Sequence, residues 1–203
     1  MNLGFLPFLQ WMVLCVILPD MLESLIKRLK EMPDNWQRRL YFAGILTKAL
    51  ESEGIRPIIV GGHAVEFYTL GGYATRDIDI AVQDRERLNG LLSSWGFKKE
   101  GRHWYSEELD MAIEAPASEL AGDAKRVTEV EVEGLTVYII GIEDIIIDRL
   151  NAFVHWKSQR DGDWAEEMLA IHHKSIDLSY LNERAEKEET VRALKDMLKR
   201  TGL

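Results

Sequence analysis

The feature that most constrains the fold is a pair of aspartates, Asp77 and Asp79, that alternates with the apolar residues Ile78 and Ile80. Period two is the repeat of a β-strand, in which alternate side chains project from the same face about 6.5 Å apart. The two carboxylates therefore point to one side of the strand, and the isoleucines point to the other side, into a core. Aspartate is disfavoured in strands, so the pair is expected to have a function.

Two carboxylates aimed at one point repel each other unless a cation lies between them. Mg²⁺ prefers oxygen ligands and is commonly held by one or two carboxylates together with substrate phosphates. Asp77 and Asp79 are therefore predicted to bind Mg²⁺, or Mn²⁺ in its place, together with a phosphorylated ligand.

A glycine pair precedes these acids. The β-branched run Ile58 to Val60 predicts a buried strand, Gly61 and Gly62 predict a tight turn, and residues 63–70 are compatible with a helix. Glycine lets the backbone approach a phosphate, and the N–H groups at a helix start favour an anion. Gly61 and Gly62 are therefore expected to position nucleotide phosphates.

The remaining pattern predicts helices, then a small mixed sheet crossed by helices, then more helices. Helices are expected at about 20–31, 34–53, 63–70, 88–95 and in several segments after 142, with further short strands near 97–99, 103–106, 109–113, 127–132 and 136–140. The expected class is α/β or α+β, with a small mixed β-sheet flanked by helices and a helical C-terminal part.

The first residues are treated separately. From Gly4 to Leu18 the chain is mostly apolar and uncharged, but this stretch is shorter than a membrane span and lacks the charged start of a secretory signal. A short anchor, a hydrophobic arm and an extension upstream of a functional start at Met21 are the alternatives, and the last is favoured. We expect an extension over residues 1–20, one domain over 21–203 that becomes helical from about residue 142, and no transmembrane span.

Composition limits the classes of molecule that the chain is expected to bind. The formal net charge of −9 argues against broad duplex DNA binding, because phosphate neutralisation supplies most of that affinity. It leaves room for a small nucleotide, whose metal ion brings positive charge. With Cys15 as the single cysteine no intrachain disulfide can form, so a reducing cytoplasm is the expected compartment.

The residue pattern of Val60-Gly61-Gly62 followed by Asp77-Ile78-Asp79-Ile80 resembles the signature of the nucleotidyltransferase superfamily with the DNA polymerase β-like fold, with a slightly longer spacer between the two parts. The stretch is most similar to small prokaryotic nucleotidyltransferase-like proteins related to toxin–antitoxin nucleotidyltransferases. The resemblance implies that fold, an NTP substrate (ATP first among them) and a divalent metal. It leaves RNA, protein or a small molecule open as the acceptor.

The resemblance also implies a third carboxylate from a neighbouring strand. Asp110, in the run Leu109 to Ile113, is the best match, and Glu108 and Glu114 are the alternatives. If Asp110 joins Asp77 and Asp79, two metal ions about 3.5–4 Å apart become plausible, and Asp110 is the expected general base or metal-bound activator.

Cationic and polar neighbours complete the predicted site. Thr75 and Arg76 are expected to contact phosphate, since arginine forks onto anions, although Arg76 fits a salt bridge equally well. The resemblance places Arg149 near the triphosphate. His63 is expected to be structural. Asp163 is expected to cap a helix rather than bind metal.

The predicted function is a metal-dependent nucleotidyltransferase that transfers an NMP from an NTP to an unknown hydroxyl acceptor. The alternative is a non-catalytic nucleotide-binding or toxin–antitoxin regulatory module of the same fold. A second rival is a helical interaction protein whose apolar N-terminus docks on a partner or a membrane.

Overall fold

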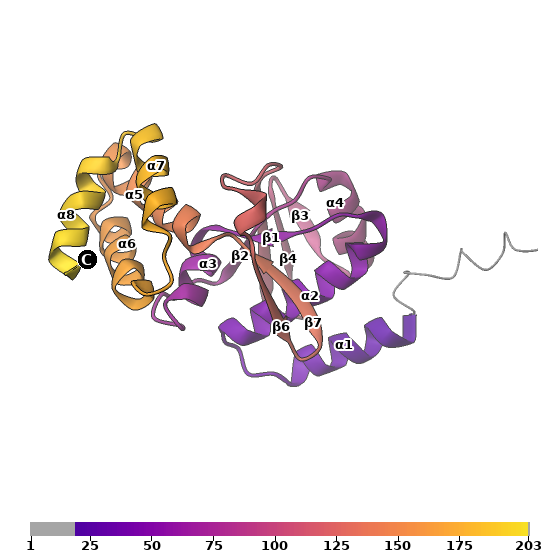
Figure 1. Cartoon of the computed structure of the whole chain (residues 1–203). Coiled ribbons are helices and arrows are strands. Elements are labelled where there is room, and N and C mark those ends of the chain that lie inside the picture. Colours follow the sequence, from indigo (N-terminus) through magenta and orange to yellow (C-terminus); the bar gives the residue numbers. More distant parts are fainter. Residues whose placement is uncertain (1–18, 203) are drawn as a thin grey trace, which may run out of the picture.

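The structure, a computed structural model, describes residues 19–202 (Figure 1). The expected extension over residues 1–20 lies almost entirely outside this range. Among the residues that are described, no helix has the length and apolar character needed to cross a membrane.

A single mixed sheet forms the centre of the molecule, in the order β3-β4-β5-β2-β1-β7-β6. The strands are β1 (Ile58–Ile59), β2 (Asp77–Ala81), β3 (Lys98–Glu100), β4 (His103–Ser106), β5 (Met111–Ala117), β6 (Thr128–Val132) and β7 (Leu135–Ile139). The pairs β2·β5 and β1·β7 are parallel, and the other neighbouring pairs are antiparallel. The mixed sheet predicted from the sequence is therefore confirmed.

Helices flank this sheet and form the C-terminal part. They are α1 (Pro19–Glu31), α2 (Trp36–Leu50), α3 (Gly61–Tyr68), α4 (Arg85–Ser94), α5 (Ile142–Trp156), α6 (Gln159–His172), α7 (Leu178–Lys187) and α8 (Val191–Thr201). Figure 1 shows α5 to α8 gathered at one end of the molecule, with α3 between them and the sheet. The prediction that Asp163 caps a helix is wrong, because α6 begins four residues earlier, after Ser158.

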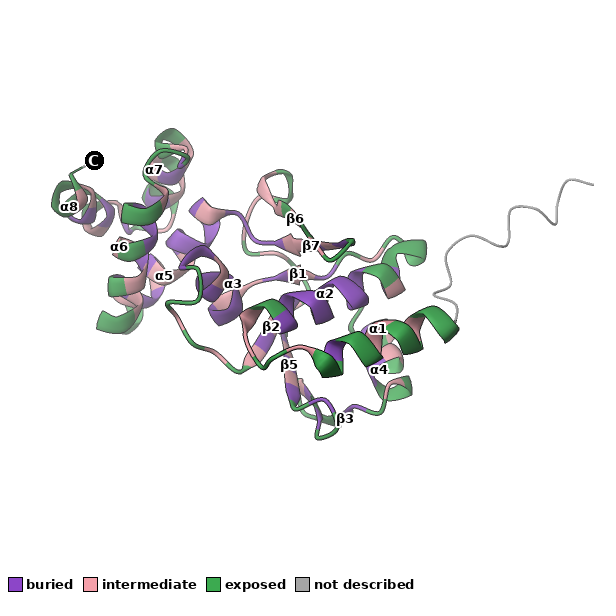
Figure 2. Ribbon diagram, turned by 90° about the horizontal axis from the view of Figure 1, so that it is seen from below, coloured by how far each residue is buried: buried purple, intermediate pink, exposed green. Residues whose placement is uncertain are grey.

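The core lies between the sheet and the helices. Ile78 and Ile80 are fully buried, as the alternation in β2 predicts, and α2 buries most of its length, including Phe42 and Ile45. Figure 2 shows the contrast between the buried α2 and the more exposed α1, which lies outside it. Because the apolar side of β2 is fixed in this core, Asp77 and Asp79 are held on the opposite side.

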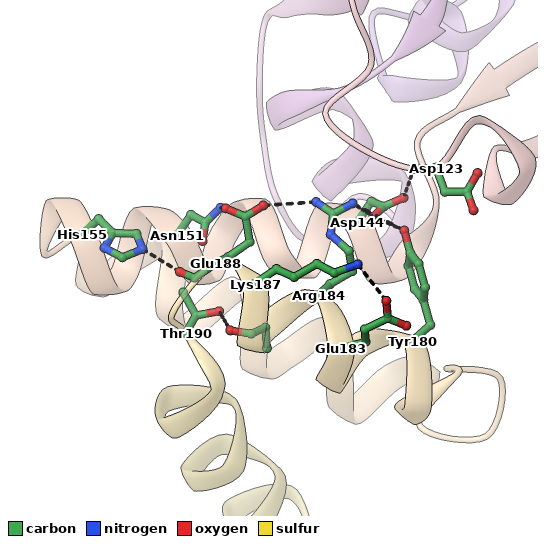
Figure 3. A network of polar contacts seen from close by, with 11 residues as sticks. Asp123, Asp144, Asn151, His155, Tyr180, Glu183, Arg184, Lys187, Glu188 and Thr190 are labelled. Atoms are coloured by element: carbon green, nitrogen blue, oxygen red, sulfur yellow. Dashed lines mark hydrogen bonds and ion pairs between the residues drawn. The ribbon is translucent and has the colours of Figure 1, made fainter.

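A buried carboxylate ties the C-terminal helices to the body (Figure 3). Asp144, in the first turn of α5, accepts hydrogen bonds from the N–H of Asp123 (2.9 Å), the hydroxyl of Tyr180 (2.8 Å) and the guanidinium of Arg184 (3.2 Å). A buried charge must be paired and hydrogen-bonded to be tolerated, and Asp144 meets both conditions. The network fixes α5, and therefore Arg149 on it, relative to the sheet.

Two glycines inside helices test this packing. A Cβ on Gly44 of α2 would lie 2.7 Å from Cβ of Leu135 on β7, whereas a Cβ on Gly90 of α4 would have nothing within 4 Å. Alanine is the better helix former by about 1 kcal/mol. We predict that Gly90→Ala raises the free energy of unfolding by about 0.5–1 kcal/mol, and that Gly44→Ala lowers it by about 1–3 kcal/mol through overpacking. Urea denaturation measures both, and a stabilising Gly44→Ala would contradict the close packing of α2 on β7.

Candidate active site

The glycine pair lies in the first turn of α3 and not in a turn before it. Gly61 has φ of 55°, a left-handed conformation that strains any residue with a side chain, and it directly follows the extended residue Val60. A Cβ on Gly61 would collide with the carboxylate of Asp79. Glycine at position 61 therefore lets the carboxylate of Asp79 lie against the start of the helix.

Asp79 uses this approach to accept a hydrogen bond. The N–H of Gly62 donates to Oδ2 of Asp79 at 2.9 Å, so a carboxylate already occupies one amide at the positive end of α3. The pKa of Asp79 is raised to about 6, chiefly by burial and also by the negative charges of Glu114 and Asp77, against the lowering effects of the Gly62 N–H and of Arg149. The negative charge of Asp79 is thus only partly compensated by its surroundings.

Asp77 lies two residues earlier on the same strand and is half-buried. Its side chain makes no hydrogen bond or ion pair with any residue between 19 and 202. A carboxylate without a partner, beside a second carboxylate with a raised pKa, makes binding of a cation at this point favourable. The oxygen donors are of the kind that Mg²⁺ prefers.

Asp110 and Glu114, two of the candidates for a third carboxylate, lie in different surroundings. The expected strand from Leu109 is wrong at its start, because β5 begins at Met111 and Asp110 lies in the turn before it with φ of 45°. Across the parallel pair, Asp79 is level with Glu114, and Asp77 is level with Ala112. Side chains level with each other on adjacent strands share a face, so Glu114 lies beside Asp79. Sequence reasoning had Glu114 only as an alternative.

Glu114 has cationic neighbours of its own. Its side chain is 15% exposed, and the guanidinium of Arg102 lies 2.6 Å away, with Nδ1 of His103 at 3.8 Å. Within the described residues, no group of three or more His, Cys, Asp or Glu side chains is arranged to hold a metal ion. The residues present therefore fit a cation bound by one or two carboxylates, with the remaining ligands supplied by substrate phosphates or water.

The two polar residues before β2 have different surroundings. Oγ1 of Thr75 lies 3.3 Å from the position of a Cβ on Gly62, so it is packed over the start of α3. Arg76 is exposed, and its guanidinium has no ion-pair partner in the described part of the chain. Arg76, Asp77 and Asp110 line a common cavity of about 310 Å³.

Arg149 reaches the site from α5. Its side chain is 17% exposed and forms ion pairs with Asp148 and with Asp161, the latter at 2.7 Å. Its charge lowers the pKa of Asp79. Two carboxylates hold the guanidinium in position, so it is oriented before any ligand arrives.

Residues that the sequence pattern did not single out lie beside the glycine turn. Cε1 of Tyr73 lies 3.1 Å from the position of a Cβ on Gly62. The Tyr73 ring packs edge-on against Trp164 at 5.2 Å between centroids, and the guanidinium of Arg160 lies 5.2 Å from the Tyr73 ring centre. These contacts join α6 to the segment before β2, and only the folded chain brings them together.

A network of buried polar side chains links α3 to α2. His63 is fully buried, and its Nδ1 lies 3.2 Å from Glu66, which also accepts two hydrogen bonds of 2.8 Å from Arg39. Burial lowers the pKa of His63. His63 is therefore surrounded by protein and does not face a ligand.

Most of the chain matches the model of a known protein family. Residues 45–201 match the family model described as "Nucleotidyltransferase of unknown function (DUF6036)". No curated protein matches the chain significantly.

Two solved structures are similar in fold. An antigenic nucleotidyltransferase-like protein from Paracoccidioides brasiliensis has a TM-score of 0.53 and 15% identity, over 82% of this chain and 93% of its own. The antibiotic-resistance factor ANT(2'')-Ia has a TM-score of 0.48 and 15% identity, over 78% and 94%. The first likeness bears out the predicted fold.

Substitution of Gly61 tests the contact with Asp79. Gly61 and Gly54 both have positive φ, but a Cβ on Gly54 would have nothing within 4 Å. We predict that both alanine variants lose about 1–2 kcal/mol of unfolding free energy to backbone strain, and that Gly61→Ala loses about 1–3 kcal/mol more by collision with Asp79. In a double-mutant cycle, Asp79→Ala should remove most of this extra loss. Equal losses at the two glycines would show that Asp79 does not lie against residue 61.

The raised pKa of Asp79 predicts that Asp79→Asn increases the free energy of unfolding in a pH-dependent way. The folded state favours the protonated acid, with a pKa of about 6 against a reference value of 3.8. Ionised Asp79 therefore destabilises the protein progressively as pH rises from about 4 to above 6. We predict that Asp79→Asn raises the free energy of unfolding at pH 8 by about 1–3 kcal/mol, and that this gain vanishes towards pH 4. Guanidinium denaturation across this range measures it, and a gain independent of pH would point to a cause other than the charge.

Proposed function

The chain belongs to the DUF6036 family of nucleotidyltransferases of unknown function, and on that premise we propose that it transfers an NMP from an NTP to a hydroxyl acceptor. The observation that carries the proposal is the hydrogen bond from the Gly62 N–H, at the start of α3, to Asp79, with Asp77 two residues earlier on the same strand. We further propose that residues 21–203 act as one functional unit.

A divalent metal ion, Mg²⁺ or Mn²⁺, would be held by Asp77 and Asp79, and when bound it would neutralise charge on the phosphates and polarise the α-phosphate. Asp79 is anchored by the Gly62 N–H, so its second oxygen is left to face the cation. Asp77, which has no partner in the described chain, would orient on the same cation. The raised pKa of Asp79 supports this role, because cation binding would relieve the repulsion from its neighbours.

Positive groups around the glycine turn would bind the triphosphate. Arg149 is held in place by Asp148 and Asp161, and Arg160 lies on the Tyr73 ring beside Gly62. An arginine that is oriented in advance loses little freedom when it binds phosphate. We propose Arg149 and Arg160 as phosphate ligands, and the amide of Gly61 as a weaker one, because the Gly62 N–H already donates to Asp79.

The acceptor hydroxyl oxygen would attack the α-phosphorus while the bond to the β-phosphate oxygen breaks and pyrophosphate leaves. The hydroxyl proton needs a base in reach. Glu114, level with Asp79 on β5, is better placed for this than Asp110, so we propose Glu114 as the proton acceptor. Its ion pair with Arg102 would then have to loosen, which is inexpensive because Arg102 is 64% exposed.

One observation favours the non-catalytic alternative. The described acids do not form a three-ligand metal cluster, and Glu114 is paired with Arg102. A module that binds nucleotide for regulation, as in a toxin–antitoxin pair, would need only the first two carboxylates. NMP transfer, which needs a base, would occur in the enzyme and not in the regulatory module, so this step distinguishes the two functions.

Incubation with α-³²P-labelled NTPs, Mg²⁺ or Mn²⁺ and cell extract tests the proposal. We expect the chain to transfer label to an acceptor, with ATP as the first nucleotide to try, and Asp77→Ala/Asp79→Ala to give none. Glu114→Gln should lower kcat about 100-fold or more, while Asp110→Asn leaves kcat near wild type. Nucleotide binding by calorimetry without any transfer would favour the regulatory module. Loss of kcat in Asp110→Asn with full activity in Glu114→Gln would reverse the assignment of the base.

A further inference from the structure

A buried ion pair joins α2 to α3 close to the glycine turn. Nη2 of Arg39 donates to both carboxylate oxygens of Glu66 at 2.8 Å, and the two side chains are 10% and 6% exposed. The same carboxylate lies 3.2 Å from Nδ1 of His63. His63 directly follows Gly62, whose N–H donates to Asp79. Only His63 therefore separates the pair from the amide that anchors Asp79.

Both members of the pair are charged. Burial opposes the ionisation of Glu66, but hydrogen bonds from His63 and Arg39 outweigh it, so the pKa of Glu66 is lowered. Burial lowers the pKa of His63, so its imidazole is neutral at pH 7 and can donate Nδ1–H to Glu66. Arg39 and Glu66 thus place two full charges in the interior.

Stability alone does not account for this arrangement. Replacing a buried ion pair by apolar residues of similar volume is often neutral or stabilising, because two charges no longer have to leave water. The pair also lies beside two unsatisfied polar atoms, since Nε of Arg39 and Nε2 of His63 are buried without a hydrogen-bond partner among residues 19–202. An unsatisfied buried polar atom is itself destabilising. The geometry that the pair imposes is the better explanation.

That geometry concerns a short helix. α3 has eight residues, and a helix of this length depends on tertiary contacts for its position. Its N-terminus has no side-chain cap, and the glycines of its first turn have no side chain with which to hold it. His63 and Glu66 are three residues apart and so lie on one side of the helix. Apolar packing has no direction, whereas hydrogen bonds to this side restrain the rotation of the first turn.

Arg39 also reaches the surroundings of the other aspartate. It lines the cavity of about 310 Å³ that Asp77 lines, and its Nη1 lies 3.6 Å from Asp34 in the same wall. One guanidinium therefore contacts both α3, which anchors Asp79, and the cavity beside Asp77.

Resting on the proposed function, we propose that Arg39 and Glu66 are positioning residues for nucleotidyl transfer. Through His63 they hold the Gly62 N–H on one oxygen of Asp79, so that the other oxygen faces the cation. Both residues act through this turn and not on the substrate.

Glu66→Gln and the double variant Arg39→Met/Glu66→Leu test the proposal in the full chain. The first removes one charge and keeps the shape of the side chain, and the second removes both charges, so it should still fold. NMR hydrogen exchange compares the Gly62 amide, which bonds to the Asp79 side chain, with the Val60 amide, which bonds to the Asp79 main-chain oxygen at 2.9 Å. We expect exchange at Gly62 to become about tenfold faster relative to Val60, as the loss of one hydrogen bond implies. A general loss of stability would accelerate both amides alike.

Calorimetry with Mn²⁺ and a non-hydrolysable ATP analogue measures the consequence for binding. We expect the Kd of Arg39→Met/Glu66→Leu to rise about tenfold, because one oxygen of Asp79 is no longer fixed. Arg39→Lys keeps a charged partner for Glu66 and should stay near wild type. Arg87→Met/Glu53→Leu is the matched control, since it removes an ion pair of 2.7 Å that is more exposed and joins the end of α2 to α4. It should change neither measurement.

A folded Glu66→Gln or double variant in which Gly62 keeps its exchange rate relative to Val60 would overturn the proposal, because the pair would then serve the fold alone. If the wild-type chain binds no Mn²⁺ and ATP analogue, the proposed function fails instead. The exchange at Gly62 would still decide whether the pair positions this turn.

Discussion

The hydrogen bond from the Gly62 N–H to Asp79 is the interaction on which the site depends. It joins the first turn of α3 to the middle of β2, and it is possible only because residue 61 has no side chain to collide with the carboxylate. Burial of Asp79, with Glu114 and Asp77 nearby, raises its pKa to about 6, although the Gly62 N–H lowers it in part. The positive end of α3 only partly offsets the repulsion between Asp79 and the neighbouring acids, so binding of a cation at this point would be favourable.

Much of the fold follows from local patterns. The alternation of Ile78 and Ile80 with the aspartates fixes the orientation of β2, and the apolar stripe through Phe42 and Ile45 fixes that of α2. Local patterns do not determine where elements begin. Helix α6 starts at Gln159, after a Ser158 whose side chain makes no capping hydrogen bond, although Asp163 carries the stronger capping signature. The order of the strands depends on contacts between distant segments, which no short motif records.

The candidate site, like the fold, can be predicted from the sequence only in part. Asp77, Asp79 and the glycine pair can be found from the sequence because each signal lies within one strand or one helix start. The third acid cannot, because Asp110 and Glu114 both flank apolar residues and only the register of β5 on β2 brings Glu114 level with Asp79. Tyr73 and Arg160 were missed for a related reason, since their contact joins segments far apart in the chain. A cavity shared with Asp77 likewise becomes visible only when three strand ends meet.

The central claim is that Asp79 is a buried carboxylate with a raised pKa, at which binding of a cation is favourable. NMR titration of ¹³C-labelled aspartate side chains tests this claim most directly. The account predicts a midpoint near pH 6 for Asp79 in metal-free protein, assigned by its absence in the asparagine variant. It also predicts a clear fall of that midpoint when Mg²⁺ and a non-hydrolysable NTP analogue are added. A midpoint close to the ordinary value of 3.8, unchanged by Mg²⁺ and nucleotide, would contradict it.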